Sequence, residues 1–460
     1  MSRAVIEGGA VVTADGAGSG IGTEHPEGHV VIEDGRILSV GPGSAPAQDV
    51  AVERIDASGC LVTPGLVNTH DHLFQWATRG FAPDSTLFDW LVRLYPVWAG
   101  LDAEVEHDAA SAGLAWSALS GCTTTADHHY VFPRDGGDVF GALVAASERV
   151  GLRLHAVRGS MDRGRSDGGL PPDSVVEDRD AALAGTAEAI QRFHDPAPGA
   201  HVRVAVGPCS PFTVSTGLLR ESAELARSHG VRLHTHLAET LDEHEQCRRE
   251  FGRTPAEHAE QAGWTGPDVW LAHAVHLSDD GVQLLGRTGT GAAHCPSSNG
   301  RLGAGVAPVR PLLDAGAPVG LGIDGVASNE AGGLAPELRQ ALLTCRARYG
   351  PEALRVRDAL WLATRGGARC LGREDELGSL EPGKLADVAV WRLDGLGHAG
   401  VEDPVTALVL GPQPTLERLL RGGGTLVEGG RLTTASEADL TRELRRAGRR
   451  ILERRPEVSP

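Results

Sequence analysis

The sequence predicts an α/β protein: a (β/α)8 TIM-type barrel with a small composite β-sandwich domain built from both termini. Eight short apolar segments recur through the middle of the 460-residue chain, separated by stretches long enough for a helix and a return. Several of these segments end in histidine or aspartate, and catalytic residues at the carboxyl ends of several strands are typical of such barrels. Short alternating runs with glycine and aspartate turns occupy both ends of the chain instead.

The two β-rich ends, residues 1–60 and 376–460, are predicted to form one domain, and residues 61–375 to form the barrel. The first end contains Asp34-Gly35, a two-residue signal for a hairpin turn. Residues from about 378 to 430 carry similar alternating runs. We therefore expect one composite domain rather than two unrelated β caps.

A basic run from Arg442 to Arg455 lies near the end of the chain and predicts a C-terminal helix. We expect its charges to lie on a solvated face. A contact between subunits of a homo-oligomer is the alternative, and the sequence leaves it open.

The predicted barrel strands are short apolar runs, some of them rich in β-branched residues. Helical patterns fill the gaps, for example over residues 215–230 and 335–347. The loops after the first three strands are long and rich in glycine, proline and aspartate, which is typical of loops that carry specificity. The eight strands are expected to end at or near His72, Asp127, Arg158, Val206, His236, His273, His294 and Asp324.

His70 and His72 end the first predicted strand, after an apolar run. Residues two apart on a strand point to the same side, so both imidazoles are expected to face the barrel interior. One such pair alone is more often two ordinary histidines. Matching polar residues recur downstream in the order of later strands, and this favours half of a metal site.

Three later strand ends supply the rest of the predicted site. One ends in His236 with Glu239 just beyond it, another ends in His273, and the last ends in Asp324. Three histidines and a carboxylate form a nitrogen and oxygen ligand set that suits zinc or iron. The pattern therefore predicts a metal-dependent enzyme.

The net charge of −18 argues against a polynucleotide substrate, because such a surface repels a phosphate backbone. No apolar run is long enough to cross a bilayer, so no membrane partner is expected. The seven cysteines are scattered and include no Cys-x-x-Cys pair, which predicts a reducing, cytoplasmic location. The expected partner is a small molecule.

The chain resembles the amidohydrolase superfamily, in its aminohydrolase (deaminase) branch. Within that branch it is most similar to the 8-oxoguanine deaminases. The resemblance is carried by Pro64-Gly-Leu-Val-Asn-Thr-His-Asp-His, His234-Thr-His-Leu-Ala-Glu-Thr, His294-Cys-Pro-Ser-Ser-Asn299, Gly322-Ile-Asp324-Gly and Glu381-Pro-Gly-Lys-Leu-Ala-Asp-Val, with family-like stretches at Thr86-Leu-Phe-Asp-Trp-Leu, Asp127-His-His-Tyr, Pro208-Cys-Ser-Pro-Phe and Ala327-Ser-Asn-Glu.

The resemblance implies hydrolytic deamination of an oxidised purine, with 8-oxoguanine and water giving urate and ammonia. A pterin (isoxanthopterin) or s-triazine aminohydrolase or chlorohydrolase on the same metal centre is the close alternative. Many superfamily members bridge two metals with a carboxylated barrel lysine, but Lys384 is the only lysine here and lies outside the predicted barrel. That absence counts against a cyclic-amide hydrolase, and the complete ligand set counts against an inactive scaffold.

The pattern and the resemblance together assign roles to the site residues. Glu239 is expected to move protons between water and substrate, rather than merely start a helix. His273 is expected to orient the attacking water, and Asp324 to accept its proton. The expected cofactor is one divalent metal ion, with zinc favoured and iron the alternative. Its ligands are expected to be His70, His72, His236 and Asp324.

Three residues are expected to contact the substrate. Gln75 follows the first histidine pair in a loop, and its amide suits the lactam edge of a heterocycle. Trp90 belongs to an aromatic cluster from which one or two rings are expected to stack on a flat ring. His129 follows the second strand, although the sequence does not separate it from its neighbour His128.

Overall fold

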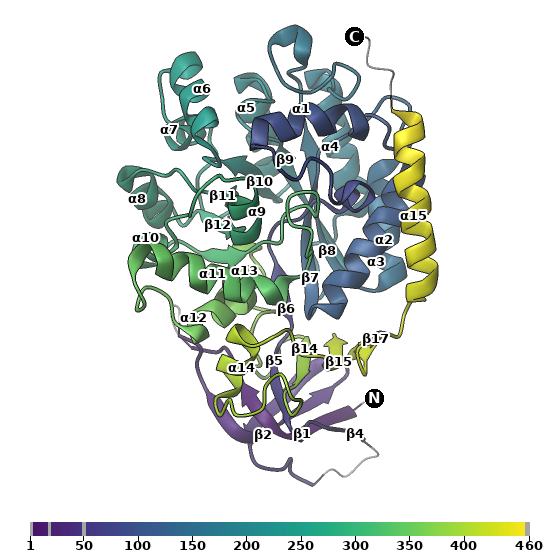
Figure 1. The fold of residues 1–460 in the computed structure, drawn as a ribbon, viewed down its shortest axis with the longest axis vertical. Helices are drawn as coiled ribbons and strands as arrows, with labels where there is room; N and C mark the ends of the chain where they lie inside the picture. The colour runs from purple at the N-terminus through teal and green to yellow at the C-terminus, as the bar shows by residue number, and fades with distance from the viewer. Residues whose placement is uncertain (1–2, 17–19, 48–51, 456–460) are drawn as a thin grey trace.

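Eight parallel strands form the centre of the protein in a computed structural model that describes residues 3–16, 20–47 and 52–455 (Figure 1). They follow one another in chain order around the sheet. The amide and hydroxyl of Thr69 both donate to the carbonyl of Leu321, which brings the first and last strands together. All eight predicted strands are confirmed: β6 (Leu66–Asn68), β7 (Cys122–His129), β8 (Arg153–Ser160), β9 (Val202–Pro208), β10 (Arg232–Leu237), β11 (Val269–His273), β12 (Gly291–His294) and β13 (Val319–Leu321).

Helices return the chain between these strands, as the periodicity predicts. The helix expected over residues 215–230 is α5, and its N-cap Ser215 accepts a hydrogen bond from the amide of Leu218. The barrel helices are α2 (Ala103–Leu119), α3 (Val139–Val150), α4 (Arg179–Phe193), α5 (Thr216–Ser228), α6 (Leu241–Phe251), α7 (Pro255–Gln261), α8 (Asp279–Thr288), α9 (Pro296–Arg301), α10 (Val309–Asp314), α11 (Leu334–Tyr349), α12 (Val356–Trp361) and α13 (Gly367–Cys370), with a π-helical turn η3 (Leu362–Gly366).

The loops after the first and third barrel strands contain short helices of their own. The connection between β6 and α2 holds a 3-10 helix, η1 (Leu73–Thr78), and then α1 (Leu87–Trp98), whereas the loop after β8 holds only the single turn η2 (Arg165–Asp167). Residues of η1 and α1 bury their aromatic side chains beside the carboxyl ends of the strands. These two elements therefore cover the face of the barrel that carries the predicted site.

Both termini contribute to one hydrogen-bonded sheet beside the barrel (Figure 1). Strand β14 pairs antiparallel with β5, which joins the C-terminal strands to the N-terminal ones. Asp34 and Gly35 have φ of 46° and 79° and form the predicted hairpin turn. The strands are β1 (Arg3–Val12), β2 (Glu24–Glu33), β3 (Arg36–Pro42), β4 (Glu53–Asp56), β5 (Cys60–Pro64), β14 (Val388–Arg392), β15 (Leu416–Arg421), β16 (Gly424–Glu428) and β17 (Arg431–Leu432).

The terminal sheet and the barrel are joined by buried contacts. The ring of Trp391 lies against Gly121, where an added Cβ would stand 2.2 Å from the ring, so only glycine fits. The guanidinium of Arg153 in the barrel pairs with Asp387 at 2.5 Å, and both side chains are buried. The boundary is predicted at residue 60, whereas β5 continues the terminal sheet to Pro64, and Gly65 links it to the first barrel strand.

The C-terminal helix α15 (Glu437–Arg454) is present as expected, but it packs along α2 of the barrel (Figure 1). Arg446 pairs with Asp108 at 2.6 Å, and Arg450 pairs with Asp102 at 2.6 Å. Their side chains are 51% and 38% exposed, so the basic face is solvated as expected, and it also pairs with carboxylates of the barrel. A short helix, α14 (Pro404–Leu410), lies between β14 and β15.

No helix in the described ranges is both long and apolar enough to cross a bilayer. All seven cysteines are buried and free.

Candidate active site

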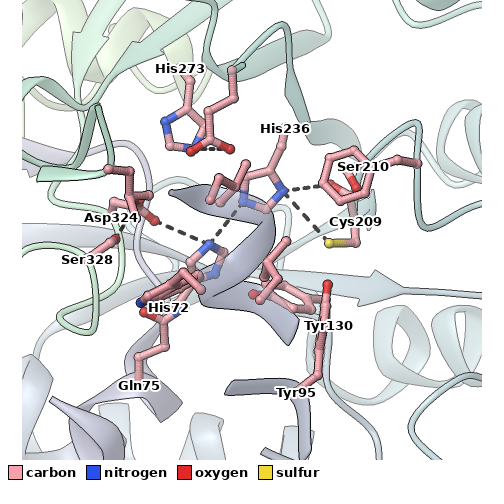
Figure 2. A pocket seen from close by; sticks show the side chains of 16 residues that line it. His72, Gln75, Tyr95, Tyr130, Cys209, Ser210, His236, His273, Asp324 and Ser328 are labelled. Atoms are coloured by element: carbon pink, nitrogen blue, oxygen red, sulfur yellow. Dashed lines mark hydrogen bonds and ion pairs between the residues drawn. The ribbon is translucent and has the colours of Figure 1, made fainter. Parts of the chain in front are cut away.

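Three imidazoles meet at the carboxyl ends of the barrel strands. His70 and His72 lie in the segment directly after β6, and His236 lies in β10. One nitrogen of each ring lies within 4.8 Å of the corresponding atoms of the other two. The Nε2 atoms of His72 and His236 are 3.0 Å apart. Figure 2 shows these two rings at the centre of the pocket.

The opposite nitrogen of each ring donates a hydrogen bond that fixes the tautomer. His72 Nδ1 donates to the carbonyl of His128 at 2.7 Å, and His236 Nδ1 donates to the carbonyl of Cys209 at 2.6 Å. His70 Nδ1 lies 2.8 Å from His234 Nε2, and His234 Nδ1 donates to a backbone carbonyl. Each of the three rings therefore turns the lone pair of Nε2 toward the others, the arrangement that supports metal-ligating histidines.

This arrangement fits a divalent metal. Two lone pairs that face each other at 3.0 Å repel unless a cation lies between them, and His70 Nε2 has no hydrogen-bond partner among the described residues. Tetrahedral zinc with nitrogen ligands at 2.0–2.1 Å separates those nitrogens by about 3.3 Å. Burial, then the charge of His70, lowers the pKa of His72 to about 3, and burial also lowers that of His236, so both rings stay neutral as ligands must.

Asp324 supplies the carboxylate beside the histidines. Its Oδ1 lies 3.4 Å from the Nε2 atoms of both His70 and His72, and Figure 2 shows it beside His72. Its Oδ2 accepts hydrogen bonds from the hydroxyls of Ser298 and Ser328 at 2.5 and 3.1 Å. Burial alone would raise the pKa of Asp324, but the imidazoles around it hold that pKa well below its usual range. The residue has φ of 64°, a strained backbone conformation that is characteristic of functional sites.

Glu239 lies in the turn after β10 and is buried. Burial raises the pKa of its carboxyl to about 7, so the group can both accept and donate a proton near neutral pH. The turn is held by Glu243, whose two carboxylate oxygens accept from the amides of Ala238 and Glu239 at 2.8 and 2.9 Å. Ala238 has φ of 54°, so the chain turns sharply just before the predicted proton carrier.

His273 faces Glu239 across the site, with Nε2 3.7 Å from Oε2 (Figure 2). Its Nδ1 donates to Oδ1 of Asn299 at 3.0 Å. Burial would lower the pKa of His273, but the charges of Glu239 and Asp324 raise it overall. His273 therefore places a donor between the two carboxylates, where it can orient a reacting water. Its ring also lies in a second possible ligand group with His70 and Asp324.

The histidines and carboxylates open into a pocket with aromatic and apolar walls (Figure 2). Tyr95 and Tyr130 line one side, and Cys209 and Ser210 lie next to His236. The remaining wall is apolar and comes from α1 and the loops after β9 and β12: Leu87, Trp90, Leu91, Phe212 and Leu302. A flat heterocycle with one polar reacting edge suits such a pocket.

Two of the three predicted substrate contacts lie in this pocket wall. Gln75 comes from η1, and its Oε1 accepts a hydrogen bond from the amide of Ala327 at 3.3 Å. The indole of Trp90 donates to the carbonyl of Ala327 at 3.1 Å. Both side chains therefore hold the loop after β13 through hydrogen bonds. The groups that remain available to a ligand are the amide nitrogen of Gln75 and the ring face of Trp90.

His129 lies outside the pocket wall, contrary to the expectation of a substrate contact. Its Nε2 donates to the carbonyl of Val131 at 2.9 Å, and its Nδ1 lies 3.5 Å from Glu106 in α2. His129 ends β7 and lies beside Glu106 of α2, whereas the next residue, Tyr130, lines the pocket. His128 donates to the carbonyl of Gly207 inside the barrel.

Several supporting residues were not singled out by the sequence analysis. Asn68 accepts from the amides of His70 and Ile323 at 3.3 and 3.0 Å, which ties together the two ends of the barrel sheet. Its amide nitrogen donates to Asp71, which points away from the ligands as the alternation along a strand predicts. Ser298 and Asn299 do lie in a family-like stretch of the sequence, His294 to Asn299, and that stretch could have indicated them. Ser298 hydrogen-bonds Asp324, and Asn299 hydrogen-bonds His273.

Comparisons with known proteins agree with this geometry and confirm the resemblance seen in the sequence. The 8-oxoguanine deaminase of Pseudomonas aeruginosa is 47% identical over 406 residues, which cover 88% of this chain and 90% of that protein. The isoxanthopterin deaminase of an unknown prokaryotic organism is 37% identical, over 86% of this chain and 87% of that protein.

Solved structures show the same architecture. Atrazine chlorohydrolase from Arthrobacter aurescens TC1, complexed with zinc, superposes with a TM-score of 0.91 at 35% identity, covering 97% of this chain and 100% of that one. The pattern of the Amidohydrolase family matches residues 61–425, which span the whole barrel and part of the terminal sheet. With this match and relatives that cover most of its length, the chain belongs to the amidohydrolase family.

Proposed function

We propose that this protein is a metal-dependent aminohydrolase that converts 8-oxoguanine and water into urate and ammonia. The observation that carries the proposal is the cluster of three neutral imidazoles and Asp324, with the buried Glu239, at the base of a pocket with aromatic walls. The 47% identity to an 8-oxoguanine deaminase over nearly the whole chain supports the choice of substrate.

We propose one divalent metal ion, zinc rather than iron, held by His70, His72, His236 and Asp324. When bound, the ion supplies a water that is activated at neutral pH. The zinc complex of the atrazine chlorohydrolase relative supports this choice of ion. The absence of any barrel lysine supports a single ion rather than a lysine-bridged pair.

The side chains of the site account for the proton movements of the reaction. Asp324 accepts one proton as the water oxygen forms its bond to the amine-bearing carbon. Glu239 protonates the ring nitrogen beside that carbon, and its pKa of about 7 suits this exchange. His273 holds the water in line by donating to it. The proton of the added hydroxyl then moves to the amine, the carbon–nitrogen bond breaks and ammonia leaves, and the proton held by Asp324 passes back to Glu239.

Gln75 and Trp90 are proposed to hold the heterocycle, the first through its amide nitrogen and the second by stacking. The substrate is a small molecule, and the seven free cysteines support a reducing compartment such as the cytoplasm.

The test is ammonia release from a panel of heterocycles by the metal-loaded enzyme. We expect kcat/KM for 8-oxoguanine to exceed that for guanine, isoxanthopterin and hydroxylated triazines. A site that pairs with the 8-oxo and N7–H groups leaves its own polar atoms unpaired when an analogue lacks them, and such sites discriminate by as much as about 10⁴-fold. A panel in which isoxanthopterin or a triazine gives the highest kcat/KM would overturn the substrate and leave the metal-dependent chemistry standing.

A further inference from the structure

A polar cavity lies at the amino ends of the barrel strands, the end opposite to the metal centre. Its volume is about 210 Å³, and its wall includes His155 of β8, Arg203 of β9 and Arg232 of β10. His155 and Arg203 are direct neighbours in the strand register. Exposed residues Gly230 and Gly372 lie at its rim, so the cavity is open to solvent.

The wall carries more positive than negative charge. Arg373 lies behind it, fully buried, so three guanidinium groups gather in this region. Among the described residues, Glu376 is the one carboxylate within ion-pair distance of these three arginines; it pairs with Arg373 and lies 3.2 Å from Arg203. The described lining of the cavity therefore holds two arginines and no carboxylate, in a chain whose net charge is −18.

Several nitrogens in and behind the wall have no hydrogen-bond partner within the described ranges, but they are buried and do not open into the cavity. His155 is 1% exposed, and its Nδ1 has no hydrogen-bond partner among the described residues. The same holds for Nε of Arg203, Nε of Arg232 and one terminal nitrogen of Arg373. His194 Nδ1 accepts from the amide of Val204 at 3.1 Å, so its other nitrogen carries the hydrogen that faces the cavity.

We propose that this cavity binds a tetrahedral oxyanion, either free inorganic phosphate or the phosphate end of a small phosphomonoester. The guanidinium groups of Arg203 and Arg232 both line the cavity, and an anion bound there makes charge-assisted hydrogen bonds to them that are stronger than those of neutral water. A cavity of this size holds about seven water molecules at roughly 30 Å³ each, which is ample for one phosphate group.

The position of the cavity indicates what the bound anion does. It links the loop before β9, the loop before β10 and the segment from Cys370 to Glu376, at the end of the barrel where residues serve stability rather than catalysis. Arg232 already donates to the carbonyl of Cys370 at 2.8 Å across this junction. The anion is therefore expected to raise the melting temperature and leave kcat unchanged.

The test is calorimetric titration of the metal-loaded protein with inorganic phosphate, and separately with glycerol 3-phosphate, at constant ionic strength. We expect one saturable site per chain. Arg203→Gln and Arg232→Gln each remove a charged donor and are expected to weaken binding by about 10- to 100-fold. Arg287→Gln, on an exposed side chain that pairs only with Glu260 at the surface, is the matched control and is expected to bind as tightly as the unmodified protein.

The unmodified protein provides a test that does not depend on the variants folding. Absence of saturable binding at millimolar phosphate overturns the proposal. So does binding that is equally weakened in Arg287→Gln, or unchanged in both cavity variants. Binding of phosphate alone assigns the site to a free oxyanion, and tighter binding of glycerol 3-phosphate assigns it to a phosphomonoester.

Discussion

Replacement of Glu243 tests whether the turn that carries Glu239 is held by one buried carboxylate. Glu243 accepts from the amides of Ala238 and Glu239, at 2.8 and 2.9 Å, and contacts neither the pocket nor the metal ligands. In Glu243→Gln, one oxygen becomes an NH₂ group that faces an amide N–H donor. One charge-assisted hydrogen bond is lost, which costs about 1.5–3 kcal/mol.

The expected result is a loss of kcat with little change in metal content. Because Ala238 is held at φ of 54°, release of its amide lets the turn relax and moves the carboxylate of Glu239. A displacement near 1 Å costs about 10²-fold in rate. We expect kcat to fall by one to two decades while KM changes little, since Glu243 does not touch the substrate pocket.

Steady-state ammonia release, metal analysis and thermal unfolding measure the three quantities. The matched control is Glu245→Gln, an exposed residue on the same helix. The reasoning is refuted if kcat of Glu243→Gln equals that of Glu245→Gln in metal-replete protein. A fall that arises entirely from lost metal would refute it equally.

Four further outcomes follow from the site. Purified protein should hold one divalent metal per chain, and His236→Ala should lose both metal and activity; two tightly bound ions in active protein would contradict this. Glu239→Gln should keep its metal, as mass spectrometry under native conditions can show, while kcat falls by about 10²–10⁴-fold. Because burial raises the pKa of Glu239 to about 7, the protonated form that donates to the ring nitrogen is lost above that pH, so kcat should decline as pH rises through 7; a flat profile from pH 6 to 9 would argue against this role. His129→Asn should lower the melting temperature by breaking the contact with Glu106 yet leave KM unchanged, and a raised KM would return His129 to the substrate pocket.

The barrel and the candidate ligands were predictable because they depend on local patterns. Each strand end is an apolar run followed by a polar residue, and His70 and His72 follow directly after β6. Parallel strands of one barrel end at the same face, so the fold itself brings these strand ends together. No further sequence pattern is needed to predict that they meet. The helix periodicity and the turn at Asp34-Gly35 are local in the same sense.

Contacts between distant segments were not predictable. Strand β7 is buried on both faces, so apolar alternation gives no sign of which face looks inward, and His129 was therefore placed in the pocket wrongly. Asn68, Ser298 and Asn299 act through single hydrogen bonds to strands far away in the chain. Arg446 and Arg450 of α15 pair with Asp108 and Asp102 of α2 and its N-cap. These partners lie far apart in the sequence, so no local pattern indicates the pairs.

The pairing of β5 with β14 has a consequence for synthesis of the protein. Pro64 and Val388 are register partners, yet more than three hundred residues separate them. At ordinary translation rates, roughly 15 seconds to a minute pass between the synthesis of β5 and the synthesis of β14, which covers its edge. An uncovered strand edge is a template for aggregation. Nascent chains should therefore need protection by a chaperone at this edge, and fragments that end before residue 388 should be poorly soluble even though they contain every proposed metal ligand.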